Sequence, residues 1–250
     1  MTANQAKPSR AGIGRSLDIY YRDTARFQRM HDLHRSLVRS GDLVFDIGAH
    51  VGDRTASFLR LGARVVALEP QPRVFRALRL LHGRGKNATL VGSAIGREAG
   101  SMTLFLNTRN PTVSTLSQDF MDAASDADGW REQVWDDTVT VPVTTLDALI
   151  AQHGVPNFVK LDVEGHEAAA LEGLSKPIPA LSFEFTTLQR AAANACLDRI
   201  CALADYEYNL SLGEDHMLRH TVWISAGALR DELRALPNAA NSGDVYARRL

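Results

Sequence analysis

The stretch FDIGAHVGD, residues 45–53, places an acid and two glycines directly after an apolar strand. A strand, a glycine turn and a helix in succession are typical of βαβ folds in which the turn contacts a ligand. A dinucleotide fingerprint would have its second glycine at position 50, where this chain has His50, and the sequence contains no G-x-x-x-x-G-K-[ST] motif. The turn is therefore not predicted to hold a phosphate group, and an NAD-linked dehydrogenase is disfavoured.

Strand and helix patterns alternate on both sides of this turn, which predicts βαβ units and a parallel sheet. Pro72 stands in the first turn of one predicted helix, Thr144 or Thr145 is the expected N-cap of another, and Gly173 is expected near the end of a third. Strand patterns cover 43–49, 64–70, 88–95, 101–107, 139–144, 157–163, 180–185, 206–212 and 220–225, the last taken as the final strand. Helical patterns cover 23–39, 55–61, 72–82, 187–204, a segment after Thr145, one before Gly173 and one ending at Leu236.

The domain organisation follows from the same patterns. Residues 1–40 are predicted to form an N-terminal extension, flexible over 1–15 and helical over 23–39, and residues 41–250 to form a single domain. The polar segment 108–137 interrupts this domain and has only one weak helical pattern. If the apolar side of the 23–39 helix is exposed, it could form a homodimer interface or a lid over the site.

Composition excludes several classes of function. The 250 residues carry a formal net charge of -1, so the chain offers nucleic acid no electrostatic attraction, and 45% of them are hydrophobic, enough to fill a core. No run of about 18 apolar residues predicts a membrane span, and a cytoplasmic location is expected. Cys196 and Cys201 lie five residues apart in a helical pattern, so both are expected to be reduced, structural thiols.

Polar residues are expected at the carboxyl ends of five strands, where open α/β sheets bind ligands. They are Asp46, Glu69, Ser93, Asp162 and Glu184. Glu69 ends the second strand, where an acid accepts hydrogen bonds from both hydroxyls of a ribose. Asp46 is expected to help hold a positively charged amino end. A nucleoside bound beside acids, with no phosphate cradle, indicates S-adenosylmethionine as cofactor, with S-adenosylhomocysteine as product.

The chain also resembles a known family, the FkbM-type S-adenosylmethionine-dependent methyltransferases. The resemblance covers roughly residues 40–250 and rests on DLVFDIGAHVGDRT, VVALEPQP, VTTLDALI, NFVKLDVEGHEAAALEGL, SFEF and SGDVYARRL, with KLDVEGHE as the most specific element. It implies a Rossmann-like class I methyltransferase fold, an α/β fold with a seven-stranded, mostly parallel sheet whose last strand is antiparallel and with helices on both faces. It also implies O-methylation of a hydroxyl on a sugar, a lipid or a polyketide-like small molecule.

The predicted cofactor contacts combine the turn, the strand ends and this resemblance. Position 50 is commonly asparagine in the family, so the contact that His50 makes is open, and the loop NPTVSTLS (110–117) is expected to close over the cofactor through Ser114. The predicted cofactor-binding residues are Asp46, Gly48, Ala49, His50, Gly52, Glu69, Pro70, Ser93, Ala94, Ser114 and Asp162.

Methyl transfer to a hydroxyl benefits from a general base, and the KLDVEGHE turn supplies the candidates. Asp162 and Glu164 are favoured by position, His166 is third, and His50 remains open. Lys160, on the strand before the turn, is expected to pair with a neighbouring acid. A magnesium ion held by Asp162 and the acid of the next strand is a less favoured alternative to a base, and no histidine and cysteine spacing suggests zinc. A second hypothesis for the whole chain is a catalytically silent domain that binds the cofactor as a regulatory partner.

Overall fold

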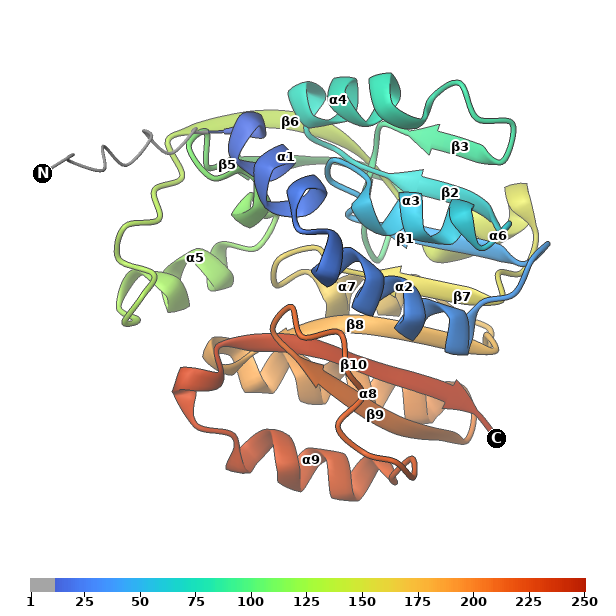
Figure 1. Ribbon diagram of the computed structural model, residues 1–250. Coiled ribbons are helices and arrows are strands. Elements are labelled where there is room, and N and C mark those ends of the chain that lie inside the picture. The colour runs from blue at the N-terminus through green and yellow to red at the C-terminus, as the bar shows by residue number, and fades with distance from the viewer. Residues whose placement is uncertain (1–11) are drawn as a thin grey trace, which may run out of the picture.

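The computed structural model describes residues 12–250, and its centre is a seven-stranded sheet with the order β3-β2-β1-β7-β8-β10-β9 (Figure 1). The strands are β1 (Leu43–Ile47), β2 (Arg64–Leu68), β3 (Ala88–Val91), β7 (Phe158–Leu161), β8 (Ala180–Thr186), β9 (Tyr206–Leu212) and β10 (Ser242–Arg249). Strands β3, β2, β1, β7 and β8 pair in parallel, whereas β10 is antiparallel to both β8 and β9. The predicted sheet of seven strands with the last one antiparallel is confirmed.

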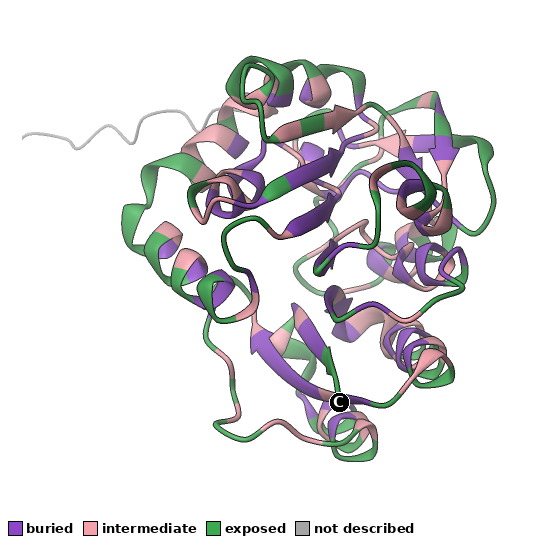
Figure 2. Ribbon diagram, turned by 90° about the vertical axis from the view of Figure 1, so that its right-hand side faces the viewer, coloured by how far each residue is buried: buried purple, intermediate pink, exposed green. Residues whose placement is uncertain are grey.

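Helices cover both faces of this sheet, as predicted. On one face lie α2 (Thr24–Leu37), α3 (Asp53–Arg60) and α4 (Pro72–His82), whose apolar side chains pack on Val44, Val65 and Phe158. On the other face lie α6 (Leu146–His153), α7 (Glu167–Glu172), α8 (Arg190–Leu203) and α9 (Ala226–Ala235). Successive residues of a strand point to opposite faces, so β1 sends Val44 to the first layer and Phe45 to the second. Figure 2 shows that the inner strands are largely buried between the layers, whereas the edge strand β3 is partly exposed.

The single strand predicted at 88–95 is two strands in the structure, one in the main sheet and one in a small second sheet. After β3 the chain leaves the main sheet at Gly92, and Ala94–Ile95 forms β4, which pairs with β6 (Asp137–Thr144). Strand β5 (Gly100–Leu106) pairs with the other edge of β6 and completes the order β4-β6-β5. The weak helical pattern in the polar segment corresponds to α5 (Gln118–Ser125), which follows the short 3-10 helix η1 (Pro111–Val113). This departure from the main sheet places Ser93 at its edge.

The extension before the sheet contains two helices rather than one. Helix α1 (Ile13–Arg22) ends at Asp23, whose side chain then accepts a hydrogen bond from the backbone N–H of Arg26 and caps α2. The flexible segment expected over 1–15 is therefore wrong for residues 13–15, while residues 1–11 lie outside the described part of the chain. Met30 and Leu33 of α2 are buried, so this helix does not present the exposed apolar side on which a dimer was expected.

The predicted last strand at 220–225 is wrong. These residues form only an isolated bridge between Ile224 and Tyr208, and the last strand is β10. The reason lies in Asn209 of β9, whose side chain accepts from the backbone N–H of His220 and donates to its carbonyl, at 3.0 and 2.7 Å. The Asn209 side chain thus bonds to the backbone N–H and C=O of His220, which would otherwise pair with a neighbouring strand. The segment 220–225 therefore turns away from the sheet.

Three local predictions agree with the structure. Thr145 is the N-cap of α6, accepting from the backbone N–H of Ala148, and α7 ends at Gly173. Cys196 and Cys201 are free thiols, and Cys196 is buried as expected of a structural cysteine, whereas Cys201 is exposed. Within residues 12–250, none of the helices has the length and the apolar character that a membrane crossing requires.

Candidate active site

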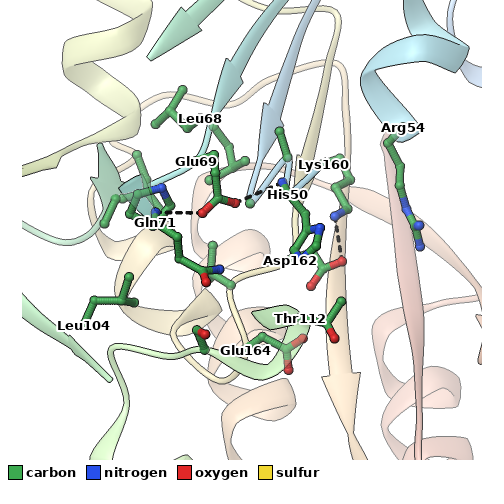
Figure 3. A pocket seen from close by; sticks show the side chains of 18 of the residues that line it. His50, Arg54, Leu68, Glu69, Gln71, Leu104, Thr112, Lys160, Asp162 and Glu164 are labelled. Carbon is green, nitrogen blue, oxygen red and sulfur yellow. Dashed lines mark hydrogen bonds and ion pairs between the residues drawn. The ribbon is translucent and has the colours of Figure 1, made fainter. Parts of the chain in front are cut away.

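The five polar residues predicted at strand ends come from five consecutive strands of the sheet, β3, β2, β1, β7 and β8. A pocket opens at this edge and encloses about 750 Å³ of space, open solvent included. Figure 3 shows Leu68 and Leu104 toward one end of the pocket, Arg54 toward the other, and Glu69, His50 and Asp162 between them. The pocket thus changes from apolar to charged along its length.

The turn between β1 and α3 forms the floor of this pocket. Gly48 has φ +76°, and a Cβ atom there would lie 1.8 Å from the backbone oxygen of Asp162, so only glycine lets the turn pack against the end of β7. The backbone N–H groups of Gly48 and Ala49 donate to Leu68 O at 3.0 and 2.8 Å. His50 also has a positive φ, 49°. These contacts fix the turn next to the ends of two strands.

Glu69 is held in place by this turn and by the residue pair after it. Its carboxylate accepts from the backbone N–H of His50 at 3.0 Å and of Gln71 at 2.8 Å, and the residue is 2% exposed. Burial raises the pKa of Glu69 to about 7, although both N–H groups act in the opposite direction. Each carboxylate oxygen can accept more than one hydrogen bond, so a ligand with two adjacent hydroxyl groups can still bind here.

The apolar end of the pocket is lined by aliphatic side chains from the small sheet and from the loop after η1. Ile95 of β4 and Leu104 of β5 contribute side chains from the small sheet, and Leu116 follows the η1 loop. Ser93, Ala94 and Ser114 also line this part, as predicted. Ser114 Oγ accepts from the backbone N–H of Asn107 at 3.2 Å, which fixes the loop against β5.

The charged end contains the carboxylates of the KLDVEGHE turn. Lys160 Nζ lies 2.6 Å from Asp162 Oδ2, which confirms the predicted pairing of this lysine with a neighbouring acid. Glu164 follows in a left-handed conformation with φ 52°, and Thr115 Oγ1 donates to its carbonyl oxygen at 2.6 Å. The carboxylate of Glu167 accepts from the backbone N–H groups of Val163 and Gly165 at 2.7 and 3.1 Å. The turn is therefore held from both sides.

Three carboxylates gather near this end, of which Asp162 and Glu164 line the pocket and Glu184 does not. Asp162, Glu164 and Glu184 of β8 each offer an oxygen, and these oxygens lie within 4.8 Å of one another. Burial, followed by the negative charge of Asp162, raises the pKa of both Glu164 and Glu184 well above the usual range. Two functions fit this geometry. One carboxylate can take a proton from a hydroxyl group, or the three together can hold a hard divalent cation such as Mg²⁺.

Most predicted site residues line the pocket and three do not. Asp46 is 0% exposed beneath the turn, where Thr55 Oγ1 donates to its Oδ2 at 2.5 Å. A Cβ atom at Gly52 would meet the His82 ring of α4, so this glycine serves helix packing. His166 is the N-cap residue of α7 and is absent from the lining of the pocket. The predicted residues that do line it are Gly48, Ala49, His50, Glu69, Pro70, Ser93, Ala94, Ser114, Asp162 and Glu164.

Several lining residues were missed by the sequence analysis. Asp53 and Arg54 follow the glycine turn directly, and their position at the start of α3 is a signal that could have identified them. Tyr20 comes from α1, and no motif near it indicates a site. Gln71 and Thr112 are the other polar residues in this group, and Gln71 Nε2 donates to Pro111 O at 3.0 Å.

Comparison with known proteins agrees with this geometry. Residues 46–210 match the profile described as the methyltransferase FkbM domain. The chain belongs to the FkbM methyltransferase family. The match begins at Asp46 and contains the turn, Glu69, the small sheet and the carboxylates of the charged end. The resemblance noted in the sequence is confirmed, and the FkbM domain accounts for most of the pocket.

Two curated relatives of this FkbM domain protein are similar over part of their length. The 31-O-demethyl-FK506 methyltransferase FkbM of Streptomyces tacrolimicus is 31% identical over 163 residues, which are 56% of this chain and 62% of the relative. The hexuronic acid methyltransferase AglP of Haloferax volcanii is 27% identical over 144 residues, which are 57% of this chain and 54% of the relative. The matched region therefore spans less than two thirds of either relative.

Solved structures with similar folds are more distant. An O-methyltransferase from Bacillus cereus in complex with SAH has a TM-score of 0.48 and 11% identity, covering 95% of this chain and 87% of that chain. A TehB-like SAM-dependent methyltransferase from Corynebacterium glutamicum has a TM-score of 0.45 and 9% identity, covering 95% of each chain.

Proposed function

We propose that this protein is an S-adenosylmethionine-dependent O-methyltransferase that methylates a hydroxyl group of a small molecule. The observation that carries the proposal is the position of Glu69 in the same pocket as Asp162 and Glu164. One carboxylate suits a ribose, and the others lie where a transferred methyl group would meet its acceptor. The name of one relative specifies a 31-O-demethyl substrate and that of the other a hexuronic acid, which supports oxygen as the acceptor atom.

The cofactor is proposed to lie along the pocket. Its adenine would contact Ile95, Leu104 and the Ser114 loop, its ribose would donate two hydrogen bonds to Glu69, and its methionine end would cross the glycine turn. Asp46 is too deeply buried to reach the amino group directly. The backbone of the glycine turn is therefore proposed to contact the amino group, the role first expected for Asp46. The sulfonium then faces the carboxylate end.

The reaction is an in-line displacement. When bound, S-adenosylmethionine would supply a methyl group that leaves sulfur with the bonding electrons staying on sulfur, and a carboxylate of the chain would accept the proton of the acceptor hydroxyl. Glu164 is the proposed base, because burial and neighbouring negative charge make it basic. Asp162 has the cation Lys160 at 2.6 Å, so its proposed role is to hold the acceptor hydroxyl in line. His166 lies outside the pocket lining and has no part in the proposed reaction.

Two measurements test this function in order. Isothermal titration calorimetry with S-adenosylmethionine tests the cofactor site, and absence of binding by the folded wild type would refute the proposal. Release of S-adenosylhomocysteine in the presence of hydroxylated acceptors, sugars and macrolide-like polyketides among them, tests the transfer. Binding without turnover across the panel would instead indicate a cofactor-binding regulatory domain.

A further inference from the structure

Helix α1 contributes a side chain to the pocket although it lies outside the FkbM match. Tyr20 is one of the lining residues, together with His50, Asp53 and Arg54 at the charged end. The match begins at residue 46, so nothing in it assigns a function to this helix. Helix α1 contacts the 3-10 helix η1, and Figure 1 shows α1 leading directly into α2. A residue of the extension therefore completes the pocket wall.

The ring of Tyr20 is held by charged neighbours. The guanidinium carbons of Arg26 and Arg54 lie 4.9 and 5.6 Å from its centroid, and the His50 ring contacts it edge-on at 5.8 Å. Asp53 bonds to both arginines, at 2.9 Å from Arg26 and 2.7 Å from Arg54, so the two cations are themselves fixed. The ring is thus positioned before any ligand enters the pocket.

The next residue fastens the same helix to the glycine turn. Tyr21 Oη donates to the carbonyl oxygen of Val51 at 2.9 Å and lies 3.0 Å from His82 Nε2. Val51 stands in the turn proposed to contact the methionine end of the cofactor. Tyr21 therefore ties α1 to the glycine turn and to α4, while Tyr20 lines the pocket itself.

The proposed ligand would bring several charged groups to the charged end of the pocket. S-adenosylmethionine carries an ammonium group, a carboxylate and a positive sulfonium at its methionine end. The guanidinium groups of Arg26 and Arg54 already lie over the Tyr20 ring, so what the ring offers this end of the ligand is an apolar wall that excludes water from the reacting atoms. Tyr20 stays neutral, because burial raises the pKa of its hydroxyl far above the usual value. It can therefore contact the sulfonium end without adding a charge.

We propose that Tyr20 is a cofactor-binding residue, which covers the methionine end of S-adenosylmethionine with its ring and makes α1 part of the cofactor site. The proposal rests on the proposed placement of the cofactor in this pocket. It differs from a lid that merely shields the pocket, because it assigns the contact to one end of the ligand. Adenosine, which has the ribose and adenine but no methionine, provides the discriminating probe.

Titration calorimetry with S-adenosylmethionine, S-adenosylhomocysteine and adenosine tests the assignment. Tyr20→Ala should raise the dissociation constants for S-adenosylmethionine and S-adenosylhomocysteine by a similar factor, about tenfold, because both have the methionine chain that the ring covers. Adenosine affinity should be unchanged, and Tyr20→Phe should bind like the wild type. Ile19→Ala is the matched control, because Ile19 is the preceding residue of α1 and its side chain is 42% exposed. Circular dichroism confirms that each variant folds.

Three results would overturn the proposal. Unchanged S-adenosylmethionine affinity in Tyr20→Ala shows that the ring makes no binding contact. An equal loss for adenosine shows that the variant disturbs the whole pocket. An equal loss in Ile19→Ala shows that α1 acts only through its stability. Failure of the wild type to bind S-adenosylmethionine refutes the proposed function itself, which is a different outcome from any of these.

Discussion

At the residue scale, Glu69 is a buried carboxyl group whose protonation should weaken binding of the proposed ribose. Glu69→Gln keeps the size of the side chain and removes the charge that two ribose hydroxyls would contact. We expect it to weaken S-adenosylmethionine binding by about 1.5 to 3 kcal/mol, the usual range for a hydrogen bond to a charged group. Titration calorimetry measures this, and an unchanged affinity would place the ribose elsewhere.

The pKa of Glu69 also predicts how binding changes with pH. Since burial raises that pKa to about 7, much of the residue is protonated at pH 6, and a protonated carboxyl accepts fewer hydrogen bonds. Binding of the ribose favours the carboxylate, so affinity should increase as pH rises from 6 to 8 and level off above. Glu69→Gln is the control and should bind with little pH dependence over this range. A wild-type affinity that falls with rising pH would contradict the assignment.

Substitution of Glu164 and of Asp162 should have different effects on the pH profile of kcat/KM. Glu164→Gln removes the proposed base and should lower kcat by about 10² to 10⁴ with little change in cofactor affinity. In the wild type, kcat/KM should rise with pH through the elevated pKa of Glu164, because only its carboxylate accepts the proton. Asp162→Asn should lower kcat by a similar or smaller factor and keep that pH profile. Assays with an active acceptor measure both.

A metal requirement would give a distinct pattern in the same assays. If activity is lost with a chelator and restored by Mg²⁺, Asp162, Glu164 and Glu184 act as cation ligands, and the base assignment for Glu164 is wrong. If chelation has no effect and Glu164→Gln turns over normally, the proton passes to another group. His50 is a lining residue whose pKa burial lowers to about 4, and His50→Ala is then the next variant.

At the scale of elements, the glycine turn depends on one close approach. Gly48→Ala would place a Cβ atom 1.8 Å from the backbone oxygen of Asp162, at φ +76°. Backbone on both sides must move, so we expect a loss of at least about 3 kcal/mol in the free energy of unfolding. Gly52→Ala is the matched control at φ +86°, where the new methyl meets side-chain atoms of His82 and Leu78. Those atoms can move aside, so its loss should be smaller. Urea unfolding measures both, and equal losses would contradict this explanation.

The elements that sequence periodicity predicted well are those buried by the main sheet. Strand β1 is apolar at each position except Asp46, and α4 begins at Pro72 and ends at His82 as expected. Periodicity failed where other contacts decide the structure. The run 88–95 looks continuous, but the chain changes sheets at Gly92, and this depends on the pairing of Ala94 and Ile95 with Val143 and Thr144 of β6, far along the chain. Helix α1 was missed because its N-cap is Gly12, which offers no capping side chain.

The same distinction applies to the site. Residues at strand ends were predictable, because parallel strands bring their carboxyl ends to one edge. Glu69 and Asp162 line the pocket for this reason. Asp46 has the same pattern, but Thr55 binds its carboxylate beneath the turn, a contact that strand order does not reveal. Tyr20 reaches the pocket only through the packing of α1, which requires the tertiary structure.

At the scale of the whole molecule, a cluster of charges joins three distant segments. Arg26 of α2 bonds to Asp53 at the start of α3 and to Glu214 in the loop after β9, at 2.9 and 2.6 Å. Arg54 bonds to the same two acids, at 2.7 and 2.9 Å. Burial opposes the charges of Asp53 and Glu214, but Arg54 and Arg26 outweigh it and lower the pKa of both acids. The cluster therefore connects α2 of the N-terminal extension to the start of α3 and to the loop after β9.

Removal of Arg26 should destabilise the protein. Arg26→Met keeps much of the stem and leaves Asp53 with one cation instead of two, so we expect a loss of about 2 to 4 kcal/mol in the free energy of unfolding. The stability that the cluster contributes is present above the unfolded acid pKa of about 4 and is lost as pH falls through the depressed folded values. The stability difference between wild type and variant should therefore shrink below pH 4.

Arg22→Met is the exposed control, with a side chain that is 70% exposed. A loss as large in the control would refute the role of the cluster.

The position of β10 has a consequence for the order in which the protein folds. β10 lies between β8 and β9, yet it follows both in the chain, so β9 has no strand partner in the main sheet until residues 242–249 arrive. During synthesis, β8 and β9 each present an open edge while α9 is still being made. Open edges are templates for pairing with other chains, and pairing across a long sequence separation is slow. The interval before insertion of β10 is thus the period when the nascent chain is most exposed to aggregation, and chaperones would act on it there.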